Sequence, residues 1–276
     1  MLQIICAADA IEFLMTRRRW IADTWDDATA ALHGDQAQHL GRVLRAQPGM
    51  EFDVIAGGHA WLARIASVDR DSVQFTLLHQ LETAPALPIT LLLSVFKFDR
   101  MEWAIEKAVE LGCGRIVPVL AERTEKHLAQ AAAKRAERWR RLALEAAKQS
   151  RRSDLPEIGE PTQLAAVVAL DEPASHDRNS FPEGVTASHP LRILLSEMEE
   201  DQPLLRILQQ RSGPAEMGQV VLAVGPEGGW TAAELALFAR SGWHSASLGP
   251  RILRVETAVI AALAVVNAAV NQSRIG

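Results

Sequence analysis

Residues 225–229, which follow the apolar run 219–224, have the types that a ligand-binding loop needs. They are Gly225, Pro226, Glu227, Gly228 and Gly229. Glycines at the carboxyl end of a strand let a ligand approach the backbone N–H and C=O groups closely. Open α/β sheets bind their ligands at that edge. The alternative interpretation is an ordinary tight turn between a strand and a helix.

The residues after this loop define its far end. Thr231 and Glu234 have the spacing of a capping box, which predicts that a helix begins there. The glycine spacing is neither G-x-G-x-x-G nor that of a P-loop, so it gives little support to nucleotide phosphate binding.

Two arginines lie between a second glycine turn and the last apolar stretch of the chain. Leu248 and Gly249 end a short predicted strand, and Arg251 and Arg254 follow before an alanine- and valine-rich helix. Guanidinium groups in such a place can hold phosphate or carboxylate in a bidentate fork. The alternative is a surface ion pair with Glu256.

A third candidate lies at the end of the apolar run 191–195. Glu197 follows this run after one residue. On its own it is better explained as a solvated acid. Because the carboxyl ends of parallel strands share one edge, the three segments are expected to converge there.

The sequence gives poor support to metal or nucleophilic chemistry. The eight histidines are scattered, with no H-x-x-x-H pair. No G-x-S-x-G motif occurs, and neither Cys6 nor Cys113 has an activating neighbour. We therefore expect no metal site.

The elements that must position the three segments alternate from residue 84 to 276. Nearly continuous apolar runs are typical of buried parallel strands, and they occur at 88–95, 115–120, 191–195 and 219–224. Apolar residues at helical spacing predict helices between them, at 100–111, 129–150, 204–211 and 232–241. The pattern predicts an α/β domain with a mostly parallel sheet. The polar stretch 171–190 is expected to be a surface loop.

Residues 1–83 are expected to form an N-terminal extension and a small β-rich domain. Alternating residues predict strands at 51–55, 61–65 and 73–77, joined by tight turns in a barrel or meander. A short helix is predicted at 36–45. The proline-containing stretch 83–88 is expected to be the linker.

Composition excludes several classes of protein. With 276 residues, 48% of them hydrophobic and 23% charged, the chain is expected to be folded rather than disordered or fibrous. No run of 18 apolar residues occurs, so a membrane span is not expected. Two cysteines fit a reducing compartment, the cytoplasm. Asp9 and Glu12 precede the first basic run, which is the reverse of a secretory signal.

The charge distribution adds one candidate surface. A net charge of -5 argues against a broadly basic nucleic-acid binder, yet residues 123–152 contain ten basic and three acidic side chains. Such a local patch can attract phosphate. The alternative is a solvated helix face.

Together, these segments resemble the RsmE family of 16S ribosomal RNA uracil-N3 methyltransferases, of the SPOUT class. The resemblance covers roughly residues 17–272. It is carried by residues 225–229 with Glu234, 248–254 with Glu256-Thr257-Ala258, Lys97, 106–112, Glu145-Ala146, Gln149-Ser150, and in the first domain His39-Leu40, Val43-Leu44-Arg45 and Gly49.

The resemblance implies a C-terminal SPOUT domain with a parallel sheet and a deep trefoil knot, preceded by a small PUA-like β-barrel that binds RNA. It implies S-adenosylmethionine as the cofactor, bound in the knot, and a homodimer as the working unit. The implied substrate is one specific uridine of 16S rRNA in the small ribosomal subunit. General topology rules argue against knots, so this expectation depends on the resemblance alone.

The resemblance also implies a set of cofactor-binding residues. Carried over by position, they are Leu195, Glu197, Gly225, Pro226, Glu227, Gly228, Gly229, Leu248, Gly249, Ile252, Leu253 and Arg254.

The implied reaction sets a chemical problem at uracil N3. The N3–H group is a weak acid, with a pKa on the order of that of a tyrosine phenol. The enzyme must therefore favour the anion and hold N3 in line with the methyl group. We expect Arg254 to stabilise the anionic uracil or the transition state. Glu227 and Glu256 are candidates for accepting the proton or for orienting Arg254.

RNA binding is expected to use arginines of both domains. The target base must leave its stack to reach the pocket, and guanidinium groups would hold the flanking phosphates. The candidates are Arg17, Arg18, Arg19, Arg42 and Arg45 in the first domain, and Arg138, Arg141 and Arg152 in the second.

The chain departs from the family pattern in three places. Sixteen residues precede Arg17, as a true extension or from an early start codon. Trp230 replaces a smaller apolar residue, and Lys148 and Arg151 add positive charge around Gln149-Ser150.

Three other functions stay open. One is another SPOUT methyltransferase, acting on transfer RNA or on a ribose 2'-hydroxyl. The second is a non-catalytic ribosome-assembly factor that binds RNA. The third is a Rossmann-type nucleotide enzyme, which the missing G-x-G-x-x-G motif disfavours.

Overall fold

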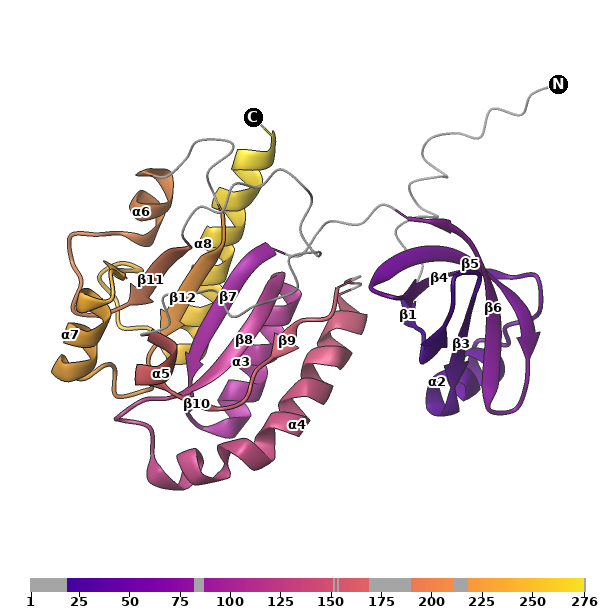
Figure 1. The fold of residues 1–276 in the computed structure, drawn as a ribbon, viewed down its shortest axis with the longest axis horizontal. Helices are drawn as coiled ribbons and strands as arrows, with labels where there is room; N and C mark the ends of the chain where they lie inside the picture. Colours follow the sequence, from indigo (N-terminus) through magenta and orange to yellow (C-terminus); the bar gives the residue numbers. More distant parts are fainter. Residues whose placement is uncertain are drawn as a thin grey trace. The chain divides into compact units, whose positions relative to one another are not determined.

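The structure is a computed structural model that describes residues 19–81, 87–150, 152, 154–168, 190–210 and 218–275 (Figure 1). The chain divides into two compact units, one of residues 1–85 with 147–155 and one of residues 86–146 with 156–276. Each unit has its own sheet.

The first unit is built on a six-stranded sheet of order β1-β4-β5-β6-β3-β2. Strand β1 pairs with β4 in parallel, and the other pairs are antiparallel. The strands are β1 (Arg19–Ile21), β2 (Thr24–Trp25), β3 (Thr29–His33), β4 (Glu51–Ala56), β5 (His59–Val68) and β6 (Ser72–Gln80). The three strands predicted from alternation are confirmed as β4, β5 and β6. Alternate side chains such as Val54, Ile65 and Phe75 are buried in this unit's core.

The short helix predicted at 36–45 is present with a change of type. Helix α2 (Gly34–Gln38) continues directly into the π-helical turn η1 (His39–Val43). Arg45 follows with a φ of 51°, the left-handed region that an arginine rarely adopts. The chain thus leaves the helix by a sharp turn that side-chain periodicity could not predict.

The second unit is built on a parallel sheet of order β10-β8-β7-β12-β11-β13, with β9 also paired to β8. All of its pairs are parallel. The strands are β7 (Leu87–Ser94), β8 (Cys113–Leu120), β9 (Glu157–Ile158), β10 (Thr162–Gln163), β11 (Leu191–Leu195), β12 (Val220–Val224) and β13 (His244–Ala246). The predicted α/β class and parallel sheet are therefore confirmed.

Helices cover both faces of this sheet (Figure 1). They are α3 (Phe98–Glu110), α4 (Lys126–Gln149), α5 (Leu164–Val168), α6 (Leu204–Gln210), α7 (Ala232–Arg240) and α8 (Val255–Ile275). One face packs against α5 and α7 through a cluster that includes Leu92, Leu194 and Phe238. Helices α3 and α8 pack together, and Asn267 Nδ2 of α8 donates to the Leu111 carbonyl at the end of α3, 3.2 Å away.

Two of the sequence expectations need comment. The predicted linker 83–88 is too long, because Leu87 and Pro88 already belong to β7. Of the expected loop 171–190, only Pro190 lies within the described residues. None of the helices in the described part of the chain is both long and apolar enough to cross a membrane.

Candidate functional site

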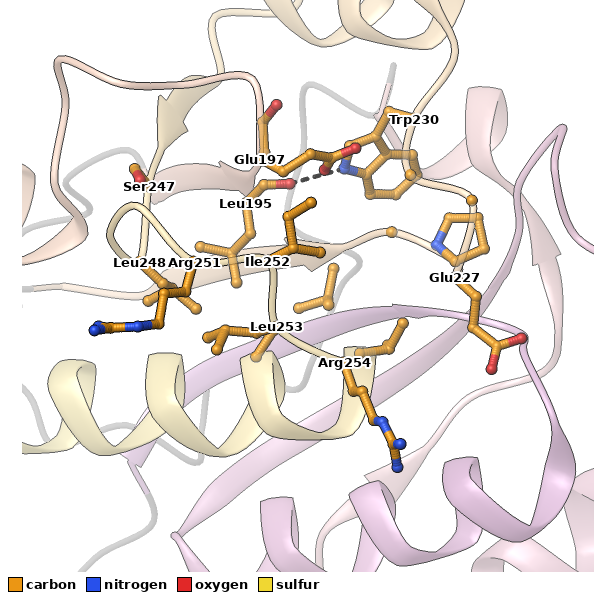
Figure 2. Close-up of a pocket in the computed structure, with 18 of the residues that line it drawn as sticks. Leu195, Glu197, Glu227, Trp230, Ser247, Leu248, Arg251, Ile252, Leu253 and Arg254 are labelled. Carbon is orange, nitrogen blue, oxygen red and sulfur yellow. Dashed lines mark hydrogen bonds between the residues drawn. The ribbon is translucent and has the colours of Figure 1, made fainter.

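A pocket of about 490 Å³ lies at the carboxyl ends of β11, β12 and β13 (Figure 2). Three segments form it, residues 195–197, 224–230 and 246–255, and Arg100 and Ala258 complete the lining. The three segments singled out in the sequence are thus brought together at one edge of the sheet.

All twelve residues predicted to bind a cofactor line this pocket. They are Leu195, Glu197, Gly225, Pro226, Glu227, Gly228, Gly229, Leu248, Gly249, Ile252, Leu253 and Arg254. Arg251 lines it as well. Glu256, the remaining predicted catalytic residue, does not.

Trp230 ties the glycine loop to the neighbouring strand end. Its Nε1 donates to the Leu195 carbonyl over 3.0 Å in a buried hydrogen bond. A Cβ on Gly225 would come within 3.1 Å of the Trp230 ring, so the ring packs where only glycine leaves room. The strand end at Leu195 and the loop are therefore held as one wall.

Gly229 has two reasons to be glycine. Its φ is +68°, and a Cβ there would lie 2.3 Å from Glu197 Oε1. A left-handed conformation costs other residues about 1–2 kcal/mol. The space between the loop and the Glu197 carboxylate therefore has room for a hydrogen atom at position 229 but not for a methyl group.

Arg123 holds the glycine loop from outside. Its Nη1 donates to the Gly228 carbonyl at 2.5 Å and to the Trp230 carbonyl at 3.3 Å. These bonds occupy two carbonyl oxygens of the loop. A charged donor makes such bonds stronger than neutral ones.

The predicted capping box is present at the start of α7. The Thr231 N–H donates to Glu234 Oε2 at 2.8 Å, and the Glu234 N–H donates to Thr231 Oγ1 at 3.3 Å. The same box reaches the turn after β8, where the Glu122 N–H donates to Glu234 Oε1 and the Thr231 hydroxyl donates to Glu122 Oε2, each at 2.8 Å. This is why the Glu234 carboxylate is buried at 7% exposure without being unpaired.

The opposite wall, residues 247–254, is anchored at its start, where the Ser247 N–H donates to the Gln202 carbonyl and the Leu204 N–H donates to the Ser247 carbonyl, each at 2.9 Å. The Gly249 N–H donates to Ser247 Oγ at 3.1 Å, and Gly249 has a φ of +111°. Ile252 is 89% exposed. The Arg254 backbone carbonyl accepts from the Ala258 N–H at 2.8 Å, whereas its exposed side chain has no hydrogen-bond or ion-pair partner among the described residues.

Opposite charges meet at one end of the pocket. Figure 2 shows the Glu227 and Arg254 side chains extending from that end. Arg100 Nη1, from the first turn of α3, donates to Glu227 Oε1 at 2.9 Å. The Arg254 side chain has no such partner, so no described acid neutralises its positive charge.

Glu256 is buried in the first turn of α8. It is 8% exposed, and its Oε2 has no partner among the described residues. The surface ion pair between Glu256 and an arginine, the alternative considered for Arg251 and Arg254, does not occur among the described residues. A buried carboxylate outside the pocket is poorly placed to meet a substrate.

Sequence reasoning missed Arg100 and Arg123. Arg100 is 127 residues from its partner Glu227, and Arg123 is 105 residues from Gly228. The sequence near each arginine gives one indication of a role in the site. Arg100 follows β7 and Arg123 follows β8 by a few residues, and both are buried strands that end at the sheet edge where the pocket lies.

The arginines predicted to bind RNA lie in different settings. Arg42, Arg45 and Arg141 are exposed. Arg19 forms an ion pair with Asp53 at 3.8 Å, and Arg152 is paired with Asp154. Arg17 and Arg18 lie outside the described residues.

Arg138, another predicted RNA contact, forms a bidentate ion pair within the second unit. Its guanidinium donates to both carboxylate oxygens of Glu102, at 2.8 and 2.9 Å, and these hydrogen bonds raise the pKa of Arg138 above its ordinary value. The arginine stays charged, but binding phosphate would compete with this pair. Within the described residues, no three His, Cys, Asp or Glu side chains lie together as metal ligands would.

Comparison with known protein families assigns both units. The model of the RNA methyltransferase domain matches residues 83–267, and that of the RNA methyltransferase PUA domain matches residues 32–78. The curated ribosomal RNA small subunit methyltransferase E of Synechocystis is 35% identical over 88% of this chain and 74% of its own. The chain belongs to the RsmE family.

Other members of the RsmE family match over similar lengths. The Aquifex aeolicus enzyme of the same name is 30% identical over 85% of this chain and 92% of its own. The crystal structure of the Neisseria gonorrhoeae enzyme, bound to S-adenosylmethionine, superposes with a TM-score of 0.72. It is 28% identical and covers 91% of this chain and 97% of that one.

Proposed function

We propose that this protein transfers a methyl group from S-adenosylmethionine to N3 of a specific uridine in 16S rRNA of the small ribosomal subunit. Membership of the RsmE family makes it an S-adenosylmethionine-dependent rRNA methyltransferase. The observation that carries the proposal is the convergence of all twelve expected cofactor residues on one pocket.

The residues of the pocket fit the cofactor. Its volume of about 490 Å³ is within the usual range for small-molecule sites, about 300–1,000 Å³. Leu195, Leu248 and Leu253 supply apolar walls, and the glycine loop exposes backbone that a ligand can approach. Glu197 adds an acceptor for hydroxyl groups. When bound, S-adenosylmethionine supplies an electrophilic methyl group on a sulfonium centre.

Arg254 is the residue we assign to the charge that develops on the uracil. Moving the N3 lone pair into a bond requires loss of the N3 proton, and the resulting negative charge is shared by N3 and the two carbonyl oxygens beside it. A guanidinium with no internal partner can stabilise this charge without first breaking an ion pair.

Glu227 is the better of the two candidate proton acceptors. It lines the pocket, and its side chain is 34% exposed. Glu256 is buried and lies outside the lining. A proton acceptor must come within hydrogen-bond reach of the proton that it removes, which favours Glu227 and leaves Glu256 a structural role in α8.

The first unit is proposed to bind RNA as a PUA-like β-barrel spanning residues 1–83, with the methyltransferase domain at 84–276. Exposed Arg42 in the π-helical turn and exposed Arg45 after it support this, because they can contact phosphate without breaking an ion pair among the described residues. Arg17, Arg18, Arg19, Arg138, Arg141 and Arg152 are proposed as further phosphate contacts.

Three further features of the RsmE family are also proposed. Assembly of one pocket from the segments after β11, β12 and β13 supports a trefoil knot. Two apolar side chains near the pocket, Met198 at 77% and Ile252 at 89% exposure, support a homodimer that would cover them. A ribosomal RNA substrate in turn supports a cytoplasmic location.

The proposal is tested with methyl-labelled S-adenosylmethionine and small ribosomal subunits from cells that lack the modification. After digestion of the RNA, the label is expected in 3-methyluridine. Label in a 2'-O-methylated nucleoside, or only in transfer RNA, would keep the enzyme class and overturn the substrate. No label, together with no cofactor binding, would favour the assembly-factor alternative.

A further inference from the structure

We infer that Arg100 is a positioning residue that holds the Glu227 carboxylate in the orientation needed to accept the uracil N3 proton. This inference rests on the proposed function and adds a residue that neither the sequence motifs nor the family resemblance singled out. It starts from the one ion pair that joins helix α3 to the glycine loop among the described residues.

The ion pair lies where the reaction is proposed to occur. Both Arg100 and Glu227 line the pocket, and Arg100 Nη1 lies 2.9 Å from Glu227 Oε1. Glu227 lies in a turn of the glycine loop, closed by the Gly229 N–H donating to the Pro226 carbonyl at 2.8 Å, with no helix or strand to set its side chain. Arg100, from the first turn of α3, a helix packed against α8, fixes the orientation of this side chain.

Stability alone does not explain this pair. The two side chains are 35% and 34% exposed, and exposed pairs contribute about 0–1 kcal/mol. Its consequence is orientation instead. With Oε1 accepting from Arg100, no described residue donates a hydrogen bond to Oε2, which stays available to a ligand.

The proposed step couples one proton transfer to one methyl transfer. Glu227 Oε2 takes the N3 proton, and the N3 lone pair forms a bond to the transferred methyl carbon. The bond from this carbon to sulfur breaks, and its electrons stay on sulfur as a neutral thioether. Glu227 returns its proton to solvent after the products leave.

The two arginines of the pocket therefore have different tasks. The charge of Arg100 is compensated by Glu227, so Arg100 contributes little to stabilising an anionic base. The Arg254 side chain has no described partner and keeps its charge for the substrate. Arg100 acts only through Glu227, so the effects of substituting the two residues on the methylation rate should not add.

The test compares Arg100→Gln, Arg100→Lys, Glu227→Gln and the double variant Arg100→Gln/Glu227→Gln in single-turnover methylation of 16S rRNA in small subunits. At pH 7 we expect the rate to fall about 100-fold for Glu227→Gln, as for loss of a general base, and about 10-fold for Arg100→Gln, as for its misplacement. The double variant should be no slower than Glu227→Gln, because coupled residues are not additive. Arg100→Lys should recover part of the rate.

A pH profile adds a measurement that a merely structural role would not move. Below the N3 pKa, about 10 by analogy with tyrosine, the solvent-generated anion increases tenfold per pH unit. The defects of Glu227→Gln and Arg100→Gln should therefore shrink as the pH rises from 7 to 9. Arg240→Ala, which removes an exposed charge at the end of α7, is the control and should match the wild type.

Two readouts are independent of turnover. Calorimetry should give a dissociation constant for S-adenosylmethionine within about threefold of wild type for Arg100→Gln, because only a transition-state interaction is lost. A crystal structure of this variant should show the Glu227 carboxylate in a new orientation.

An unchanged rate for Arg100→Gln would overturn the role of Arg100 and leave the proposed function standing. So would a defect that adds to that of Glu227→Gln and persists at pH 9. If the wild-type protein makes no 3-methyluridine in the same assay, the proposed function itself fails.

Discussion

The two walls of the pocket are built in different ways. The glycine loop, residues 225–230, is held by Arg123 from the turn after β8, by the Trp230 bond to the Leu195 carbonyl, and by the capping box of α7. The opposite wall, residues 247–254, is bonded to residues 202–204 through Ser247, and beyond that point it carries an 89% exposed Ile252 and an arginine whose side chain has no described partner. The glycine loop is bonded along its length, whereas the second wall is bonded at its start and presents the Ile252 and Arg254 side chains outward.

This difference suggests a division of tasks. A loop whose carbonyls and caps are already satisfied is preorganised, so binding a cofactor there costs little ordering. A segment with free polar groups can direct them to a ligand. We expect substitutions in the first wall to change cofactor affinity and stability, and substitutions of Arg254 in the second to change the rate of methyl transfer.

The largest effect on affinity is expected for Gly229→Ala. The left-handed φ of +68° adds about 1–2 kcal/mol of strain, and the new methyl group must displace the Glu197 carboxylate from its position beside the loop. The dissociation constant for S-adenosylmethionine, measured by calorimetry, should rise about 100-fold.

Gly242→Ala is the matched control for this substitution. Its φ is +72°, and nothing lies within 4 Å of the added Cβ. It should lower the stability through the same backbone strain and leave the cofactor affinity unchanged. Equal affinities for the two variants would contradict the role of the contact between Gly229 and Glu197.

A smaller effect is expected for Arg123→Ala. The carbonyls of Gly228 and Trp230 lose a charged donor but remain accessible to water, so the cofactor dissociation constant should rise about tenfold. Arg240→Ala removes an exposed charge elsewhere and should have no effect. If Arg123→Ala binds the cofactor as tightly as Arg240→Ala does, the loop does not need this anchor.

Trp230→Phe is expected to change stability, with the smallest effect on cofactor affinity of these three substitutions. The buried Leu195 carbonyl loses its donor, which costs about 1–3 kcal/mol of unfolding free energy. Trp243→Phe is the control, because Trp243 Nε1 is buried with no partner among the described residues. Denaturant unfolding should show a clearly smaller loss for Trp243→Phe, and equal losses would mean that the hydrogen bond contributes nothing.

Features with a strong local signal could be predicted from the sequence. Strands β7, β8, β11 and β12 are continuous apolar runs because parallel strands are buried on both faces. The capping box of α7 needs only two residues three apart. Both signals lie within a few residues of the structure that they predict.

Features that depend on distant residues could not be predicted. Strands β9 and β10 have two residues each, too few to show alternation. Arg100 and Arg123 act through partners more than one hundred residues away. The burial of Glu256 follows from the packing of α8, whereas its sequence position next to an arginine-containing segment suggested a surface or catalytic role.

The division between the two walls is tested most directly by Arg254→Ala, with two quantities measured on the same preparation. These are the S-adenosylmethionine dissociation constant and the single-turnover rate of 3-methyluridine formation in small subunits. We expect the rate to fall about 100-fold or more, as when a preorganised charge is removed, with a much smaller change in the dissociation constant. A folded Arg254→Ala protein that methylates at the wild-type rate would contradict the account.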